Sequence, residues 1–198
     1  MRQSFLLVSF LTFAVICCCH AQTAEEQPIT EEQWEQADLQ TRRLPPTAFP
    51  ELPGEIVREL VSRGCTIPQT FASSSPENII RGEFAKPEQQ DWAVLCSVNR
   101  VSSILIFWGG STHDVAEVYT APDKSELQGI GGGRIGYSRA ISTVGKEYIE
   151  SHYAAYRDGG APEPPPIDHE GINDAFIEKA STVHYFYQGK WLELAGAD

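Results

Sequence analysis

The chain has 198 residues and a formal net charge of -12 at pH 7. This length suits one globular domain of roughly 150 residues with a flanking tail. A chain this acidic repels nucleic acid and anionic lipid surfaces, and we therefore expect no nucleic-acid partner.

The N-terminus has the pattern of an export signal. Arg2 supplies a positive charge, residues 5–16 form an apolar run, and Ala21 ends a stretch suited to cleavage. The run is shorter than the roughly 20 residues of a membrane span. We therefore expect residues 1–21 to be a cleavable signal peptide, the protein to be secreted or periplasmic, and the mature chain to contain no transmembrane segment. An uncleaved anchor and lipidation at a cysteine of residues 17–19 are the minor alternatives.

The segment that follows, residues 22–48, is rich in Gln, Glu and Thr and contains few residues that could form a core. Such a composition is typical of disorder, and we expect an acidic tether here, with a transient helix over residues 31–39. A single globular domain is expected over residues 49–198.

The domain should begin with a helix, because apolar residues recur at helical spacing after Pro53 and Gly64 provides a stop. Runs of β-forming residues separated by turns then predict an antiparallel meander. Its expected strands cover residues 78–85, 91–98 and 103–108, and residues 115–119 could add a fourth. The remaining expected elements are a helix over 146–157, a short helix within 168–179, and a hairpin of strands 183–187 and 190–194.

These elements predict an α+β fold, with a mainly antiparallel sheet and two or three helices packed on one face. Cys65 follows the first helix, Cys96 lies in the second strand, and no other cysteine lies outside the expected signal. Two such cysteines can pair in an oxidising compartment, and the absence of a CxxC spacing favours a structural bond over a redox one. We expect one disulfide that ties the helix to the sheet.

A short motif lies in the expected meander. Residues 82–84 (GEF) are followed, after a turn, by residues 91–95 (DWAVL). This pattern resembles the GxF…DxAV core of FG-GAP-type repeats, whose intervening loop binds calcium through aspartates. Residues 85–90 contain no aspartate here, so the resemblance does not imply calcium binding. The chain as a whole resembles an uncharacterised family of secreted bacterial proteins, which implies a compartment and no activity.

A glycine-rich loop covers residues 129–136 (GIGGGRIG). The backbone N–H groups of Gly131, Gly132 and Gly133 could cradle an anion, with help from Arg134. The loop lacks the ending of a phosphate-binding motif, and no strand–loop–helix context is clear. A tight turn is the alternative, since glycine also serves positions with positive φ.

Two segments supply the candidates for catalysis, His113-Asp114 and Asp168-His169-Glu170. Neither carries the spacing of a zinc motif, and the chain has no GxSxG motif, so we expect no metal and no cofactor. The alternative is that these residues are surface polar groups and turn caps.

Tyrosines of the last hairpin are candidates for ligand contact. Side chains alternate along a strand, so Tyr185 and Tyr187 share one face while His184 and Phe186 share the other. An exposed tyrosine face could contact a protein or a glycan, whereas core packing is the alternative. The sequence thus favours an exported, non-catalytic module that binds an envelope or extracellular protein or a glycan. The alternative is a secreted hydrolase or metal-dependent enzyme built on the His/Asp/Glu segments.

Overall fold

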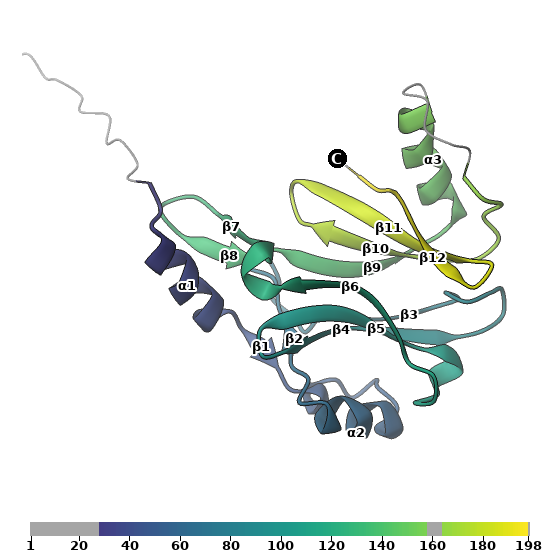
Figure 1. Cartoon of the computed structure of the whole chain (residues 1–198), viewed down its shortest axis with the longest axis horizontal. Helices are drawn as coiled ribbons and strands as arrows, with labels where there is room; N and C mark the ends of the chain where they lie inside the picture. The colour runs from purple at the N-terminus through teal and green to yellow at the C-terminus, as the bar shows by residue number, and fades with distance from the viewer. Residues whose placement is uncertain (1–27, 158–163, 198) are drawn as a thin grey trace, which may run out of the picture.

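Figure 1 shows a computed structural model of the chain, which describes residues 28–157 and 164–197. The expected signal peptide and the first part of the expected tether lie outside these residues. The helices are α1 (Glu31–Gln40), α2 (Gly54–Ser62) and α3 (Lys146–Arg157), with short 3-10 helices η1 (Pro46–Ala48), η2 (Trp108–Gly110) and η3 (Asp123–Glu126). The strands are β1 (Arg43–Leu44), β2 (Ile67–Pro68), β3 (Ile79–Gly82), β4 (Asp91–Val98), β5 (Val101–Phe107), β6 (Ala116–Pro122), β7 (Leu127–Gly129), β8 (Ile135–Tyr137), β9 (Arg139–Val144), β10 (Gly171–Phe176), β11 (Ala180–Tyr187) and β12 (Lys190–Ala195).

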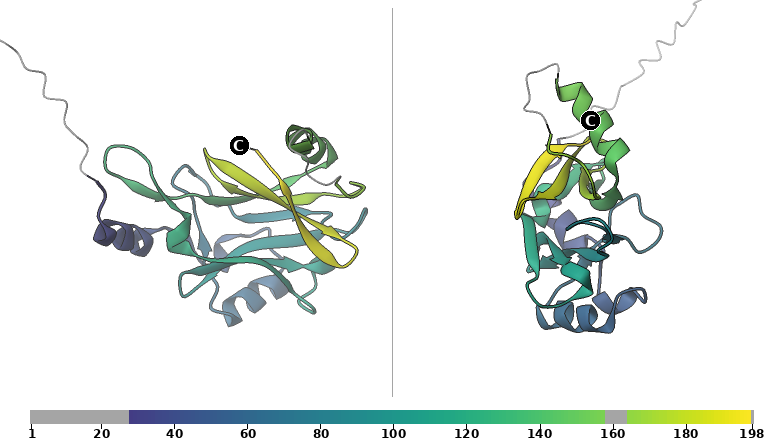
Figure 2. Two further views of the ribbon diagram at one scale, coloured as in Figure 1. Left: turned by 45° about the horizontal axis from the view of Figure 1, so that its top comes forward. Right: turned by 90° about the vertical axis from the view of Figure 1, so that its right-hand side faces the viewer.

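Two four-stranded antiparallel sheets form the body of the structure. One has the order β3-β4-β5-β6 and the other β12-β11-β10-β9, while β1-β2 and β7-β8 form two small ribbons. The sheets lie one above the other, with α2 outside the first sheet and α3 outside the second (Figures 1 and 2). The α+β class and the antiparallel pairing are therefore confirmed, and the strands divide into separate sheets with helices α2 and α3 over different ones.

Three apolar layers form the core. The first lies between α2 and the outer face of β4 and β5, and it includes Ile56 and Val94. The second lies between the two sheets and includes Leu95 and Ile172. The third lies between β11 and α3. Because β4 and β5 are covered on both faces, alternating side chains enter different layers, which explains their nearly continuous apolar sequence.

The meander, the first helix, helix α3 and the last hairpin are confirmed at the expected places. The helix expected within residues 168–179 is wrong, because Gly171–Phe176 forms β10 and pairs with both β9 and β11. Two polar residues weaken the strand pattern there, and tertiary partners satisfy both. Asp174 binds Arg139, and Asn173 contacts the hydroxyl of Tyr148.

Order begins well before residue 49. Thr30 caps α1 by accepting from the backbone N–H of Gln33, whose side chain accepts from the N–H of Thr30 in return. This capping box satisfies two N–H groups that a helix otherwise leaves free. The expectation of a disordered tether is thus wrong for residues 28–48, which form α1, β1 and η1.

The motif that resembles FG-GAP repeats forms the turn between β3 and β4. The buried carboxylate of Asp91 accepts hydrogen bonds from the backbone N–H groups of Phe84 (3.1 Å), Ala85 (2.9 Å) and Gly109 (2.7 Å). Gly82 is required by close approach, since a Cβ there would meet the Phe84 ring at 2.7 Å. The aspartate of this motif therefore organises backbone.

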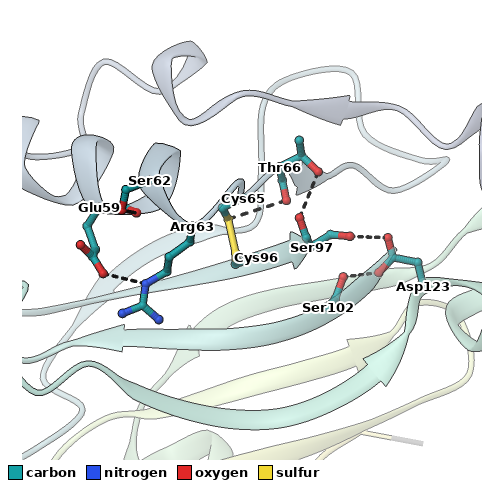
Figure 3. Close-up of a disulfide and its surroundings, with 9 residues drawn as sticks. All are labelled: Glu59, Ser62, Arg63, Cys65, Thr66, Cys96, Ser97, Ser102 and Asp123. Atoms are coloured by element: carbon teal, nitrogen blue, oxygen red, sulfur yellow. Dashed lines mark hydrogen bonds and ion pairs between the residues drawn. A yellow bond between two sulfur atoms is a disulfide. The ribbon is translucent and has the colours of Figure 1, made fainter. Parts of the chain in front are cut away.

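The disulfide joins Cys65, just after α2, to Cys96 in β4, with Cα atoms 5.4 Å apart (Figure 3). The sequence-based expectation of a bond between helix and sheet is confirmed. Both cysteines are buried in the layer between α2 and the sheet. The bond therefore fixes this layer covalently.

Replacing both cysteines with serine should lower the free energy of unfolding by roughly 3–4 kcal/mol, because the bond restricts the unfolded chain across a separation of 31 residues. Urea unfolding of the wild type and the double variant measures this. A reducing agent should shift the wild type toward the variant and leave the variant unchanged. Coincident curves for the oxidised wild type and the variant would contradict the stabilising role.

Candidate ligand-binding groove

A groove of about 640 Å³ lies between α1 and the β7–β8 hairpin. Its floor comes from the segment that follows β2 and from β8. The residues that line it are Glu32, Gln33, Gln36, Ala37, Gln40, Thr41, Arg42, Gln69, Thr70, Phe71, Ile130, Gly133, Arg134, Ile135, Gly136 and Tyr137. Amide side chains and arginines supply most of its polar groups.

Several donors in this groove are uncommitted. The side chains of Gln36, Gln40 and Arg42 form no hydrogen bond or ion pair with any described residue. The exposed Arg134 donates to the carbonyl of Gly131 in its own loop, at 3.4 Å. The groove thus holds two arginines against a single carboxylate, Glu32, on a chain whose net charge is -12.

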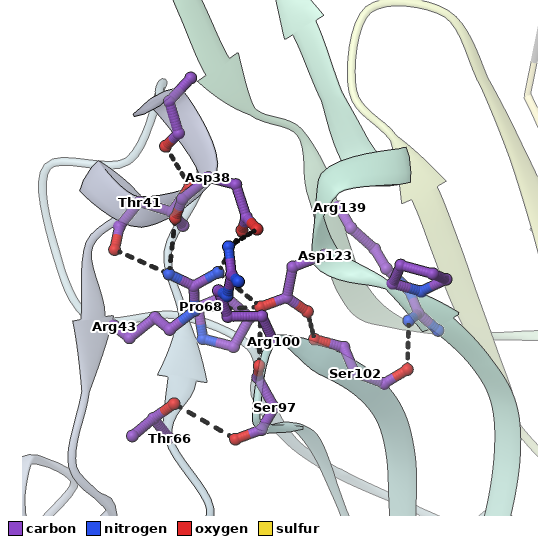
Figure 4. A network of polar contacts seen from close by, with 12 residues as sticks. Asp38, Thr41, Arg43, Thr66, Pro68, Ser97, Arg100, Ser102, Asp123 and Arg139 are labelled. Carbon is purple, nitrogen blue, oxygen red and sulfur yellow. Dashed lines mark hydrogen bonds and ion pairs between the residues drawn. The ribbon is translucent and has the colours of Figure 1, made fainter. Parts of the chain in front are cut away.

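A buried ion-pair network holds α1 in place as one wall of the groove (Figure 4). Arg43 donates to Asp38 of α1 at 2.7 Å and to Asp123 of η3 through Nε at 3.0 Å and Nη2 at 2.7 Å. Asp123 is fully buried and also accepts from the hydroxyls of Ser97, at 2.6 Å, and Ser102. Asp123 of η3 therefore joins β1, β4 and β5, and Arg43 extends this link to α1 through Asp38.

Exposed ion pairs add to this network from the solvent side. Arg100 contacts Asp38 at 2.9 Å and Glu35 at 2.7 Å, and Lys124 contacts Glu31 and Glu35. The hydrogen bond from Arg100 is the main reason that the pKa of Glu35 lies below its ordinary value. Pairs of this kind stabilise a fold only slightly because solvent screens them.

Only part of the predicted anion-binding set of the glycine loop lines the groove. Gly131, Gly132 and Gly133 adopt φ values of 80°, 60° and 69°, which supports their use as turn residues. Gly133 and Arg134 line the groove, while Gly131 and Gly132 do not. Sequence reasoning missed the wall supplied by α1 because that segment was expected to be disordered.

The expected exposed tyrosine face is wrong for Tyr185, which is fully buried in the layer beneath α3. Its ring stacks on His169 with centroids 4.3 Å apart, and its hydroxyl accepts from the N–H of Asp168. Tyr187 is half-buried at the edge of the same layer. The tyrosines are covered because this sheet has α3 over its outer face.

The catalytic candidates form two separate groups. His113 and Asp114 are exposed in the loop before β6. The ring nitrogens of His169 lie 3.0 Å and 2.9 Å from backbone carbonyl oxygens, and the carboxylate of Glu170 accepts the N–H of Glu83. The cavity lined by residues 168–170 includes neither His113 nor Asp114. In the described residues, no three His, Cys, Asp or Glu side chains are placed to hold a metal ion.

Comparison with protein-family models, curated proteins and solved structures finds no match for this chain. Among residues 28–157 and 164–197, no helix combines the length and apolar character that a membrane span requires. The functional argument therefore depends on the geometry of the molecule.

Replacing Asp123 with alanine should lower the free energy of unfolding by roughly 3–5 kcal/mol, because Arg43 would lose two hydrogen bonds and the buried hydroxyls of Ser97 and Ser102 would lose their acceptor. Chemical denaturation measures the loss, and amide hydrogen exchange in α1 reports whether this helix loosens first. The exposed Glu51→Gln variant is the matched control and should change little. A loss below about 1 kcal/mol would show that the network is not the anchor of α1.

Proposed function

We propose that this protein is an exported, non-catalytic interaction module and that the groove beside α1 is its ligand site. The observation that supports this most directly is the set of side-chain donors at the groove: the side chains of Gln36, Gln40 and Arg42 bind no described residue, and that of Arg134 donates only to a carbonyl of its own loop. Such donors are available to a partner at little internal cost, because the one internal hydrogen bond among them, from Arg134 to Gly131, is long and exposed.

The chemistry of the groove favours an acidic peptide segment of a partner protein. Arginine pairs with carboxylates through two parallel hydrogen bonds, and Arg42 and Arg134 stand at this groove. Glutamine carries both a donor and an acceptor, which match the carbonyl and N–H groups of a peptide backbone. The aromatic residues in the lining are the partly exposed Phe71 and the buried Tyr137. A sugar would find little exposed ring surface to stack on, so a peptide fits this groove better than a glycan.

The catalytic alternative has less support. Its candidate catalytic residues lie in two separate groups. Both ring nitrogens of His169 lie at hydrogen-bond distance from backbone carbonyl oxygens. General acid–base chemistry needs a side chain within hydrogen-bond reach of a substrate proton. His113 and Asp114 lie in an exposed loop, which supplies no enclosed position for a substrate.

Fluorescence polarisation of a labelled peptide of alternating Glu and Ala tests the proposal against the chain from residue 22 onward. We expect saturable binding that weakens roughly tenfold with each of Arg42→Gln and Arg134→Gln, since each change removes a charge-assisted hydrogen bond. Arg58→Gln, an exposed arginine of α2, removes the same charge elsewhere and should leave binding unchanged.

Two further probes make the result decisive. A peptide of alternating Lys and Ala should not bind, and polygalacturonate should compete poorly. Tight binding of polygalacturonate alone would replace the peptide with an acidic glycan as the ligand. Equal effects of the Arg58 and Arg42 variants, or no binding of either anionic probe, would overturn the assignment of the groove.

A further inference from the structure

The 3-10 helix η3 connects the two walls of the groove beside α1. Its first residue, Asp123, binds Arg43, which also contacts Asp38 of α1. Its last residue, Glu126, is followed directly by β7, the first strand of the hairpin on the opposite side of the groove. The carbonyl of Glu126 accepts the N–H of Ser138 at 2.8 Å, which fixes the end of η3 to the chain between β8 and β9. A movement of η3 would therefore displace both walls.

The side chain of Glu126 is buried without a counter-ion. The residue is 7% exposed and forms no ion pair with any described residue. Its one side-chain hydrogen-bond contact in the described part of the chain is the hydroxyl of Ser125, at 3.5 Å. That hydroxyl donates to the carbonyl of Pro122 at 2.6 Å, so its oxygen is left as an acceptor. Only a protonated carboxyl can donate to it, and the contacts of Glu126 therefore suit the neutral acid.

Arg139 is the cation whose charge favours ionisation of Glu126, and it is committed elsewhere. It donates to both oxygens of Asp174, at 2.9 Å and 2.8 Å, and to two backbone carbonyls. Burial acts to raise the pKa of Asp174, but hydrogen bonds from His184 and Arg139 outweigh it and hold this pKa below its ordinary value. Asp174 is therefore ionised, and ionisation of Glu126 would add a second buried negative charge to the same region.

Titratable groups surround Glu126 on every neighbouring element. They are Asp123 and Lys124 of η3, Tyr119 of β6, Tyr137 of β8, Arg139 of β9, Asp174 of β10, Lys179 of the following turn, His184 of β11 and Glu193 of β12. Burial raises the pKa of Tyr119 and of Tyr137, so both stay neutral. Lys124 pairs with two glutamates of α1, and the exposed Lys179 lies over an aromatic ring. Neither lysine forms an ion pair with Glu126.

These surroundings set the direction in which pH acts. Burial raises the pKa of Glu126 above its ordinary value, against the opposing influence of Arg139. The folded protein therefore holds this proton to higher pH than the unfolded chain does. The packed state is most favoured below the ordinary glutamate range, at about pH 4.3, and loses stability as pH rises through the raised value.

We propose that the protonation of Glu126 controls the groove beside α1, so that the groove binds its ligand at mildly acidic pH and releases it as pH rises. The neutral acid keeps η3 packed between the two walls. The ionised form favours an opened state in which the carboxylate reaches water, because an unpaired buried charge is costly and local opening relieves it. This inference rests on the proposed function of the groove as a ligand site.

Replacing Glu126 with glutamine should remove a pH-dependent loss of stability, because the amide cannot ionise. Urea unfolding from about pH 4.5 to about pH 8 should show this variant gaining on the wild type as pH increases. Glu117→Gln removes an exposed charge of β6 and should keep the pH dependence of the wild type. A constant difference between Glu126→Gln and the wild type across this range would contradict the burial effect.

The groove is tested with the labelled peptide of alternating Glu and Ala, at about pH 5.5 and about pH 8, where the peptide carboxylates and both arginines of the groove are charged. The chain from residue 22 onward should bind it roughly threefold or more weakly at the higher pH, as the competent state becomes less populated. Glu126→Gln should bind with equal affinity at both values, and Glu117→Gln should follow the wild type. A pH dependence that survives in Glu126→Gln would assign it to another group, such as His184, and overturn the proposal.

Hydrogen exchange of the protein without peptide separates this inference from the function of the groove. Amide protection in α1 and β7, corrected for the intrinsic exchange rate, should fall from about pH 5.5 to about pH 8 in the wild type and stay constant in Glu126→Gln. Falling protection without peptide binding would support the switch and overturn only the assignment of the ligand site. Constant protection in the wild type would overturn the switch, whether or not the peptide binds. Glu126→Met, which also cannot ionise, replaces the glutamine variant if melting curves show that variant to be unfolded.

Discussion

The buried carboxylate of Asp123 is the contact on which the arrangement of the N-terminal half depends. A lone charge in this position would be strongly destabilising, and it is tolerated because Arg43, Ser97 and Ser102 saturate its oxygens. Arg43 in turn reaches Asp38, so the same guanidinium carries α1. Trp34 and Ala37 also pack this helix against the layer between the sheets. The ion-pair network and these contacts together set the wall of the groove.

The elements that could be predicted from the sequence are those stabilised by their own residue pattern. Strands β4 and β5, the last hairpin and α2 have apolar spacing that matches their local geometry. Helix α1 and strand β10 do not, because polar residues with distant partners stabilise them. Asp174 in β10 binds Arg139 across 35 positions, and Arg43 binds Asp123 across 80. The residue pattern of a short stretch of sequence does not reveal pairs that lie so far apart in the chain.

The candidate sites likewise divide into parts that a local motif predicts and parts that depend on distant residues. The glycine loop was visible as a motif, and it does reach the groove through Gly133 and Arg134. The opposite wall of the groove could not be predicted, because Arg42 belongs to a segment whose composition indicates disorder. The alternating pattern of the last hairpin placed His184 on the face opposite two tyrosines. Its Nε2 contacts Asp174 of β10, and Arg139 of β9 binds the same carboxylate, so its surroundings come from separate strands.

Placement of the arginines explains how an acidic chain can present a groove for anions. Arg43 and Arg139 neutralise buried aspartates and contribute nothing to the surface potential beyond that. Arg42 and Arg134 line one groove and form no ion pair with any described residue. The net charge of -12 repels an acidic ligand at long range, but physiological salt screens charges beyond about 8 Å. Contacts with the two arginines act within that distance, so moderate salt weakens the repulsion more than the attraction. An acidic ligand would therefore associate more readily at physiological ionic strength than in dilute buffer, the reverse of the usual dependence for a complex of opposite charges.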